Sequence, residues 1–192
     1  MKKTGIIIAL VVGIILIWGW QTYNRLVTKQ EATKQAWAQV ENVCQRRADL
    51  VPNLVALVKD YLDYEASTII AVTEVRDKAA TTVVDRDVLD ENELAAFDAA
   101  QAQLGESMNR LLVAVESYPD LKASENYLTL QAQLAGCENR ILTERQRFNE
   151  VAKVYNQSVR RFPSSVIANM FGFEKRPYFE ADEGAENVPE TF

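Results

Sequence analysis

Residues 5–20 read Gly-Ile-Ile-Ile-Ala-Leu-Val-Val-Gly-Ile-Ile-Leu-Ile-Trp-Gly-Trp, and this stretch decides the fold. It lies within a longer run, from Thr4 to Asn24, that contains no charged side chain. As a helix this run is about 31 Å long, at ~1.5 Å per residue. A bilayer's hydrocarbon layer is roughly 30 Å thick, so the length and lack of charge favour a membrane span over a buried core helix.

The flanks of the apolar run predict that it stays attached. Lys2 and Lys3 precede it, as in the positive start of a signal peptide, but no small-x-small cleavage site follows. A cysteine that could be lipid-modified after cleavage is also absent here, because the first cysteine is Cys44. The run ends with aromatic residues, which favour the boundary between membrane and water. We therefore predict an uncleaved signal anchor over residues 1–24 that contacts lipid through residues 4–24.

The side of the membrane on which the rest of the chain lies is a close decision. Lys2 and Lys3 precede the run, whereas Arg25, Lys29 and Lys34 follow it. Because the two lysines directly adjoin the apolar run, we expect a cytoplasmic amino terminus. The prediction is a single-pass protein of the cell membrane, within a bacterial cell envelope, whose main domain is extracytoplasmic.

The composition removes several classes of function. The formal net charge is −6, which disfavours binding to nucleic acid, and the chain contains no histidine at all. Ser-His-Asp and Cys-His catalysis and His-ligated zinc are therefore excluded. No glycine-rich phosphate loop occurs, and no carboxylate pair lies on a predicted buried face, so neither a cofactor nor a metal site is predicted.

The residues after the anchor follow a helical period. One apolar stripe has steps of three and four, and a second stripe beside it indicates contact with two partner helices. Pro52 interrupts the segment that carries the two stripes, and it predicts either a kink in the helix or a new helix start capped by Asp49. The first stripe is Trp37, Val40, Cys44, Ala48, Val51, Val55, Val58 and Leu62, and the second is Leu50, Leu54, Leu57 and Tyr61.

Further helices are predicted over residues 65–84, 93–117 and 123–161, with a short helix capped by Ser164 or Ser165. The fold class is all-α, an anchor helix that leads into an elongated antiparallel bundle of three to four helices, partly coiled-coil in character. We assign residues 25–173 to the bundle and residues 174–192 to an acidic, extended tail in which Pro177-Tyr178-Phe179 can dock. The predicted buried face of the last long helix is Tyr127, Leu130, Leu134, Cys137, Ile141, Glu144 or Arg145, Phe148, Ala152, Tyr155, Val159 and Phe162.

Two sequence blocks resemble the LemA family. The first is residues 36–61, with Arg-Arg-Ala-Asp-Leu-Val-Pro-Asn-Leu at residues 46–54. The second runs from residue 116 to residue 179 and contains Arg147-Phe-Asn149, Tyr155-Asn156 and Met170-Phe-Gly-Phe173. The chain departs from the family pattern at Tyr64 and Phe148, where the family has His and Tyr. The resemblance implies an amino-terminal membrane segment, an antiparallel helical bundle and no established enzymatic activity.

Candidate site residues fall into three groups, each open to two interpretations. The polar group either forms ion pairs between helices or recognises a peptide or lipid headgroup. The aromatic group, with Phe162, either caps the membrane-proximal end of the bundle or contacts another copy. Two cysteines on predicted buried faces are either free thiols or a possible disulfide. The groups are Arg46, Arg47, Asp49, Pro52, Asn53, Glu138 and Arg140; Phe171, Phe173, Tyr178 and Phe179; and Cys44 with Cys137.

The predicted function is a structural or interaction module without enzymatic activity, which self-assembles as a homo-oligomer at the membrane. The alternative is an accessory or substrate-presenting factor for a membrane protease or sensor enzyme. Neither prediction identifies a membrane protein partner.

Overall fold

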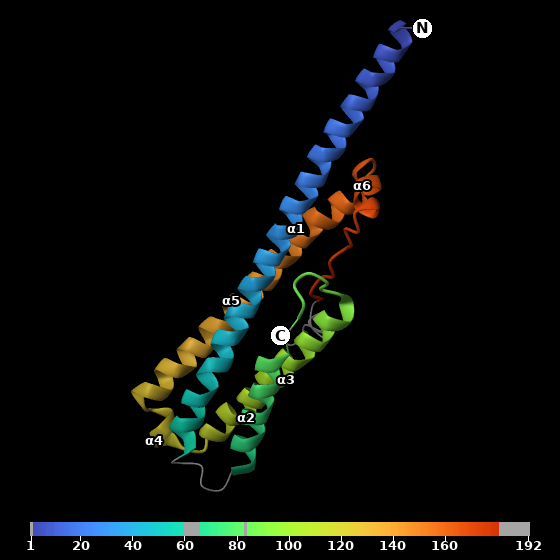
Figure 1. The fold of residues 1–192 in the computed structure, drawn as a ribbon. Coiled ribbons are helices and arrows are strands. Elements are labelled where there is room, and N and C mark those ends of the chain that lie inside the picture. The colour runs from blue at the N-terminus through green and yellow to red at the C-terminus, as the bar shows by residue number, and fades with distance from the viewer. Residues whose placement is uncertain (1, 60–65, 83, 181–192) are drawn as a thin grey trace, which may run out of the picture.

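The structure, a computed structural model, describes residues 2–59, 66–82 and 84–180, and every regular element in these ranges is a helix. The predicted all-α class is confirmed, and Figure 1 shows the elongated arrangement. The predicted positions Tyr61, Leu62 and Val83 lie outside the described residues. The helices are α1 (Lys2–Lys59), α2 (Ala66–Thr81), α3 (Glu91–Val115), α4 (Pro119–Lys122), α5 (Glu125–Arg160) and α6 (Ser164–Met170).

The helices run alternately up and down the long axis. α1 packs most extensively against α5, and α2 packs against α3, so the bundle consists of two antiparallel pairs. The short helix α4, which the sequence analysis did not predict, connects α3 to α5 at the far end. α6 returns beside α1, close to the point where the apolar run ends (Figure 1).

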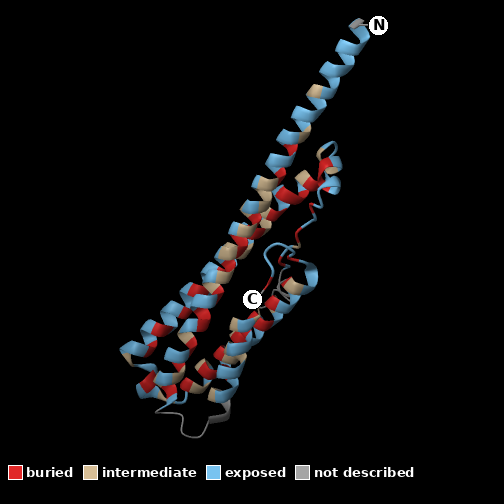
Figure 2. Ribbon diagram, viewed as in Figure 1, coloured by how far each residue is buried: buried red, intermediate tan, exposed pale blue. Residues whose placement is uncertain are grey.

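α1 is one uninterrupted helix of 58 residues with Pro52 inside it. The alternative of a new helix start capped by Asp49 is therefore wrong. The amino-terminal part of α1 is exposed except at Gly13 and Gly19, which are half-buried (Figure 2), and full burial begins at Thr22 and Leu26. α1 is long and apolar enough to cross a membrane, and its most apolar window is 0% buried inside the bundle.

Three clusters of buried side chains follow one another along the bundle. The cluster farthest from the apolar run surrounds Leu54, Leu104 and Leu111. The middle cluster surrounds Trp37 and Phe148. The third cluster lies at the end of the bundle nearest the apolar run and joins residues of α1, α5, α6 and the residues after α6. Its buried members are Leu26, Tyr155, Val159, Ile167, Ala168 and Phe173.

The predicted buried face of the last long helix is confirmed with one exception. Phe162, predicted to complete the face of α5, is 84% exposed because α5 ends at Arg160 and the chain turns there. The Ser164 side chain caps no helix; its hydroxyl donates to the Ser158 carbonyl at 2.6 Å, and Pro163 occupies the N-cap position of α6.

Capping residues explain where two other helices begin. The Asp90 carboxylate accepts a hydrogen bond from the Glu93 backbone N–H at 2.7 Å, so α3 begins two residues before its predicted start at residue 93. The Ser124 hydroxyl accepts a bond from the Tyr127 N–H at 3.3 Å, which sets the start of α5.

Candidate interaction site

The residues after α6 return along the bundle as an extended strap, residues 173–180, that two asparagine side chains of α5 hold in place. Asn156 Nδ2 donates to the Arg176 carbonyl at 2.8 Å, and the Arg176 backbone N–H donates to Asn156 Oδ1 at 2.8 Å. Asn149 makes the same pair of bonds with the backbone of Phe179, at 2.8 and 2.9 Å. An amide side chain carries both a donor and an acceptor, so each asparagine satisfies one residue of the strap as a neighbouring strand would.

The spacing of these contacts follows from helix and strand dimensions. Asn149 and Asn156 are seven residues apart, and seven helical residues rise about 10.5 Å. Arg176 and Phe179 are three residues apart, and three extended residues span about 10 Å. The two repeats therefore stay in register as the strap runs antiparallel to α5.

Phe179 closes an aromatic group in the middle of the bundle. Its ring is stacked on Trp37 and lies edge-on to Phe148, with centroids 5.7 and 5.6 Å away. The Arg145 guanidinium lies 4.8 Å from the centroid of the Phe179 ring, and Arg145 also pairs with Asp98 of α3. The strap thus contacts α1 and α5 through aromatic rings and the Arg145 guanidinium, and Arg145 in turn joins α5 to α3 through its ion pair with Asp98.

Arg176 links the strap to the connection between α2 and α3. Its side chain is only 6% exposed, and Nη2 donates to the Asp87 carbonyl at 2.6 Å. The Asp87 carboxylate pairs with Lys34 of α1. The bond to Lys34 lowers the pKa of Asp87, and the bonds to Asp87 and Glu31 raise the pKa of Lys34.

A groove of about 1050 Å³ lies between the strap, the α2–α3 connection and the α5–α6 region. Its walls mix apolar residues with both signs of charge. Among its lining residues are Leu89, Asp90, Asn156, Arg160, Arg176 and Tyr178.

Arg47 is the buried member of the predicted polar group, at 5% exposed. Nη1 pairs with Glu138 Oε1 at 2.8 Å across α1 and α5. Nη2 donates to both the backbone carbonyl and the side-chain Oε1 of Gln101 on α3, at 2.8 and 2.7 Å. One guanidinium therefore joins three helices, as the ion-pair interpretation expects.

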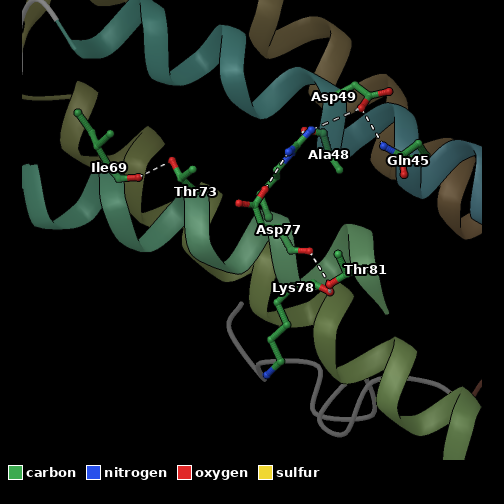
Figure 3. A network of polar contacts seen from close by, with 9 residues as sticks. Gln45, Ala48, Asp49, Ile69, Thr73, Asp77, Lys78 and Thr81 are labelled. Atoms are coloured by element: carbon green, nitrogen blue, oxygen red, sulfur yellow. Dashed lines mark hydrogen bonds and ion pairs between the residues drawn. The ribbon is translucent and has the colours of Figure 1, made fainter. Parts of the chain in front are cut away.

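The other members of the polar group lie on the surface. Arg46, Pro52, Asn53 and Arg140 are exposed, so the structure does not bring the whole group together. Asp49 accepts a bond from Gln45 Nε2 at 2.8 Å and lies 3.9 Å from Arg76 of α2, in the network of Figure 3.

The remaining aromatic candidates divide between two places. Phe173 is buried and Phe171 is 55% exposed, and both rings contact Tyr23 where α1 leaves the bundle, with centroids 5.7 and 4.8 Å away. Tyr178 is 43% exposed beside the groove. Cys44 and Cys137 are buried free thiols, so the possible disulfide is not formed.

Sequence reasoning missed the residues that hold the strap. Asn149, Asn156 and Arg176 were not among the predicted site residues. The available signal was a repeat, Phe148-Asn149 and Tyr155-Asn156, in which a buried aromatic residue precedes an asparagine at a seven-residue interval. The strap carries the matching pattern Phe173-x-x-Arg176-x-x-Phe179.

Several known proteins are similar to this chain in sequence. The magnetosome proteins MamQ 2 of Paramagnetospirillum magneticum and MamQ of Magnetospirillum gryphiswaldense are 26% and 25% identical, each match covering 82% of this chain. The chain spans 64% of the length of these MamQ proteins, less than two thirds. Protein LemA of Metamycoplasma hominis is 23% identical over 160 residues, which cover 83% of this chain and 69% of that protein.

The helical fold and the exposed apolar part of α1 are those expected of a membrane-associated helical protein. The model of the LemA family matches residues 36–192, which include α1 from residue 36 onward, the other helices and the strap. The chain belongs to the LemA family.

Proposed function

We propose that this protein is a non-enzymatic, single-pass membrane module that acts through contacts and assembles with further copies of itself. The observation that carries the proposal is the continuity of α1. Its 58 residues form a rod about 87 Å long that serves as both apolar span and core helix of the bundle. Because no joint separates the two parts, spans that pair in the membrane bring their bundles side by side.

Small residues on the span support lateral association. Gly5, Ala9 and Gly13 are four residues apart, so they share one face of α1. A side-chain carbon added at Gly5 or Gly13 would meet nothing within 4 Å. Small residues at this spacing allow the backbones of two membrane helices to approach closely.

The bonding of the buried polar groups supports a structural role. The side chains of Arg47 and Gln101 bond to each other, and those of Asn156 and Arg176 bond to the backbone of other segments. Over residues 2–59, 66–82 and 84–180, no three His, Cys, Asp or Glu side chains gather where they could hold a metal ion. The bonds of these buried polar groups hold the helices and the strap in register, which supports a structural role.

The organisation that goes with this function is an anchor over residues 1–24, a bundle over residues 25–173 and an acidic tail over residues 174–192. We place the bundle on the extracytoplasmic side of the cell membrane. The support is that Lys2 and Lys3 directly adjoin the apolar run.

Light scattering of the full chain in mild detergent tests the proposal. The expected protein mass is that of two or more copies of the 21.7 kDa chain. Gly13→Leu should lower this mass, because the added side chain separates the spans. Val11→Leu adds bulk to the opposite face of the same helix and should leave the mass unchanged. A mass of 21.7 kDa for the unmodified chain would contradict self-assembly and favour the alternative, an accessory or substrate-presenting factor for a membrane protease or sensor enzyme.

A further inference from the structure

A second apolar surface lies beside the end of the membrane span. Ile167 of α6 lies against α1 at Gly19, 3.7 Å from where a side-chain carbon on Gly19 would be. Phe171, which follows α6, contacts the Tyr23 ring at 4.8 Å. Gly19 is five residues before Asn24, so α6 lies level with roughly the last 7.5 Å of the uncharged run (Figure 1).

The exposed surface formed by α6 and the residues that flank it carries four large apolar side chains beside the exposed Asn169. Phe162 is 84% exposed, Val166 is 56%, Met170 is 65% and Phe171 is 55%. Val166 and Met170 are four residues apart and share one face of α6, whereas Ile167 and Ala168 are buried against the bundle. Phe162 lies in the turn before α6 and Phe171 directly after it, and we refer to these four side chains as the stripe. Large apolar side chains gathered on one exposed surface mark a site of contact with membrane or protein.

The position of the stripe favours lipid as its partner. Trp18 and Trp20 of α1 are 37% and 68% exposed near the same level, so the α6 surface continues the aromatic boundary of the span. Amphipathic helices bind membranes with their apolar face about 5–10 Å deep in the headgroup region, and α6 contacts α1 at Gly19, within the last part of the uncharged run.

Basic side chains frame the same surface. Arg160 and Arg161 are exposed where α5 ends, and Arg25 is exposed on α1 just beyond the span. Lysine and arginine at this level can reach lipid phosphates while their stems cover apolar surface. Glu174 is the one acidic residue between α6 and Lys175, so positive charge predominates around the stripe.

We propose that Phe162, Val166, Met170 and Phe171 form a second membrane contact, which inserts into the headgroup region of the leaflet on the bundle's side. This surface contact and the α1 span together hold the bundle at a fixed angle to the membrane. The inference rests on the membrane anchor of the proposed function but not on self-assembly.

The test uses the full chain in nanodiscs of phosphatidylcholine and phosphatidylglycerol, where both membrane faces are open to the solvent. An environment-sensitive fluorophore is attached at Met170→Cys in a Cys44→Ala, Cys137→Ala background. Leu128→Cys is the matched control, because Leu128 is 52% exposed near the far end of α5. Circular dichroism checks that each labelled variant keeps its helix content.

The expected result is at least twofold stronger quenching at position 170 than at position 128 by lipids with a doxyl group near the glycerol. Iodide should quench position 128 more strongly. Equal lipid quenching at the two positions in protein retained on nanodiscs would overturn the inference. Protection from iodide without lipid quenching would also overturn it, because another copy and not lipid would then cover α6. Protein that is not retained on the nanodiscs would instead contradict the anchor, and with it the proposed function.

Discussion

Trp37 and Phe179 stack with their ring centroids 5.7 Å apart and their planes 13° from parallel. The contact joins the middle of the first helix to the end of the strap, with nearly the whole bundle sequence between the two residues. Since Phe148 and Arg145 of α5 also contact Phe179, the strap fastens α1 to α5. The last described residues of the chain are therefore part of the core.

Phe179→Ala should release the strap from the bundle. The ring loses contacts with Trp37, Phe148 and Arg145, and we expect a loss of about 2 kcal/mol, below the usual range for a core phenylalanine because a chain end can detach locally. Amide exchange by mass spectrometry should show faster exchange over residues 173–180. Tyr178→Ala is the control, since Tyr178 is 43% exposed and its removal should change that exchange little.

Asn156→Asp tests the reciprocal hydrogen bonds separately from the aromatic contacts. The change keeps the acceptor for the Arg176 N–H but removes the donor to the Arg176 carbonyl and buries a charge. We expect a loss of about 1–3 kcal/mol in the free energy of unfolding at pH 7. Gln157→Glu makes the same amide-to-acid change at an exposed neighbouring position of α5. Equal denaturation midpoints for the two variants would show that Asn156 does not hold the strap.

Arg47→Met should destabilise the bundle more than any other single change in the predicted polar group. Methionine keeps the apolar stem but leaves both Gln101 acceptors without the guanidinium, so we expect about 2–3 kcal/mol. Arg46→Met alters an exposed neighbour and should cost less than about 0.5 kcal/mol. Glu138→Gln should cost under about 1 kcal/mol, because the Glu138 side chain is 50% exposed and Arg47 keeps its bonds to Gln101. Urea denaturation of the three variants in one detergent measures these differences.

The helices could be predicted from the sequence because their buried residues repeat with the helical period. Trp37, Phe148 and Tyr155 were expected to be buried, and each is at most 1% exposed. One of the two predictions made from Pro52, a new helix start, was wrong. Proline lacks one backbone N–H donor, but this loss did not end a helix that packs along most of its length against α5.

The strap could not be predicted in the same way. An extended segment has no helical period, and asparagines such as Asn149 and Asn156 are ordinarily taken as solvent-facing positions of a helix. Their role depends on the turn after Arg160, which sends the chain back along α5, and no local propensity encodes that return. The exposure of Phe162 has the same cause. The chain turns after Arg160, so Phe162 does not extend the buried face of α5, whose last buried residue is Val159.

The Cys44 thiol supplies a prediction for the dependence of stability on pH. Burial raises its pKa from 9.0 to about 11, although the positive charges of Arg47 and Arg145 act in the opposite direction. The folded chain therefore keeps this proton at pH values where the unfolded chain has lost it. Below about pH 8 the thiol is neutral in both states, and its effect on stability does not change with pH.

Between about pH 9 and pH 11 the unfolded chain ionises first, so the free energy of unfolding should fall by up to about 2–3 kcal/mol on account of this thiol. Cys44→Ala should lack this part of the decline. Both proteins are compared in a Cys137→Ala background, so that the only thiol present is at position 44, and other groups that titrate in this range cancel in the difference. Thermal unfolding of both proteins in detergent from pH 8 to pH 11 measures the difference in their stability at each pH. Parallel stability curves would show that Cys44 ionises equally readily in both states and is therefore not sealed from water by the helices around it.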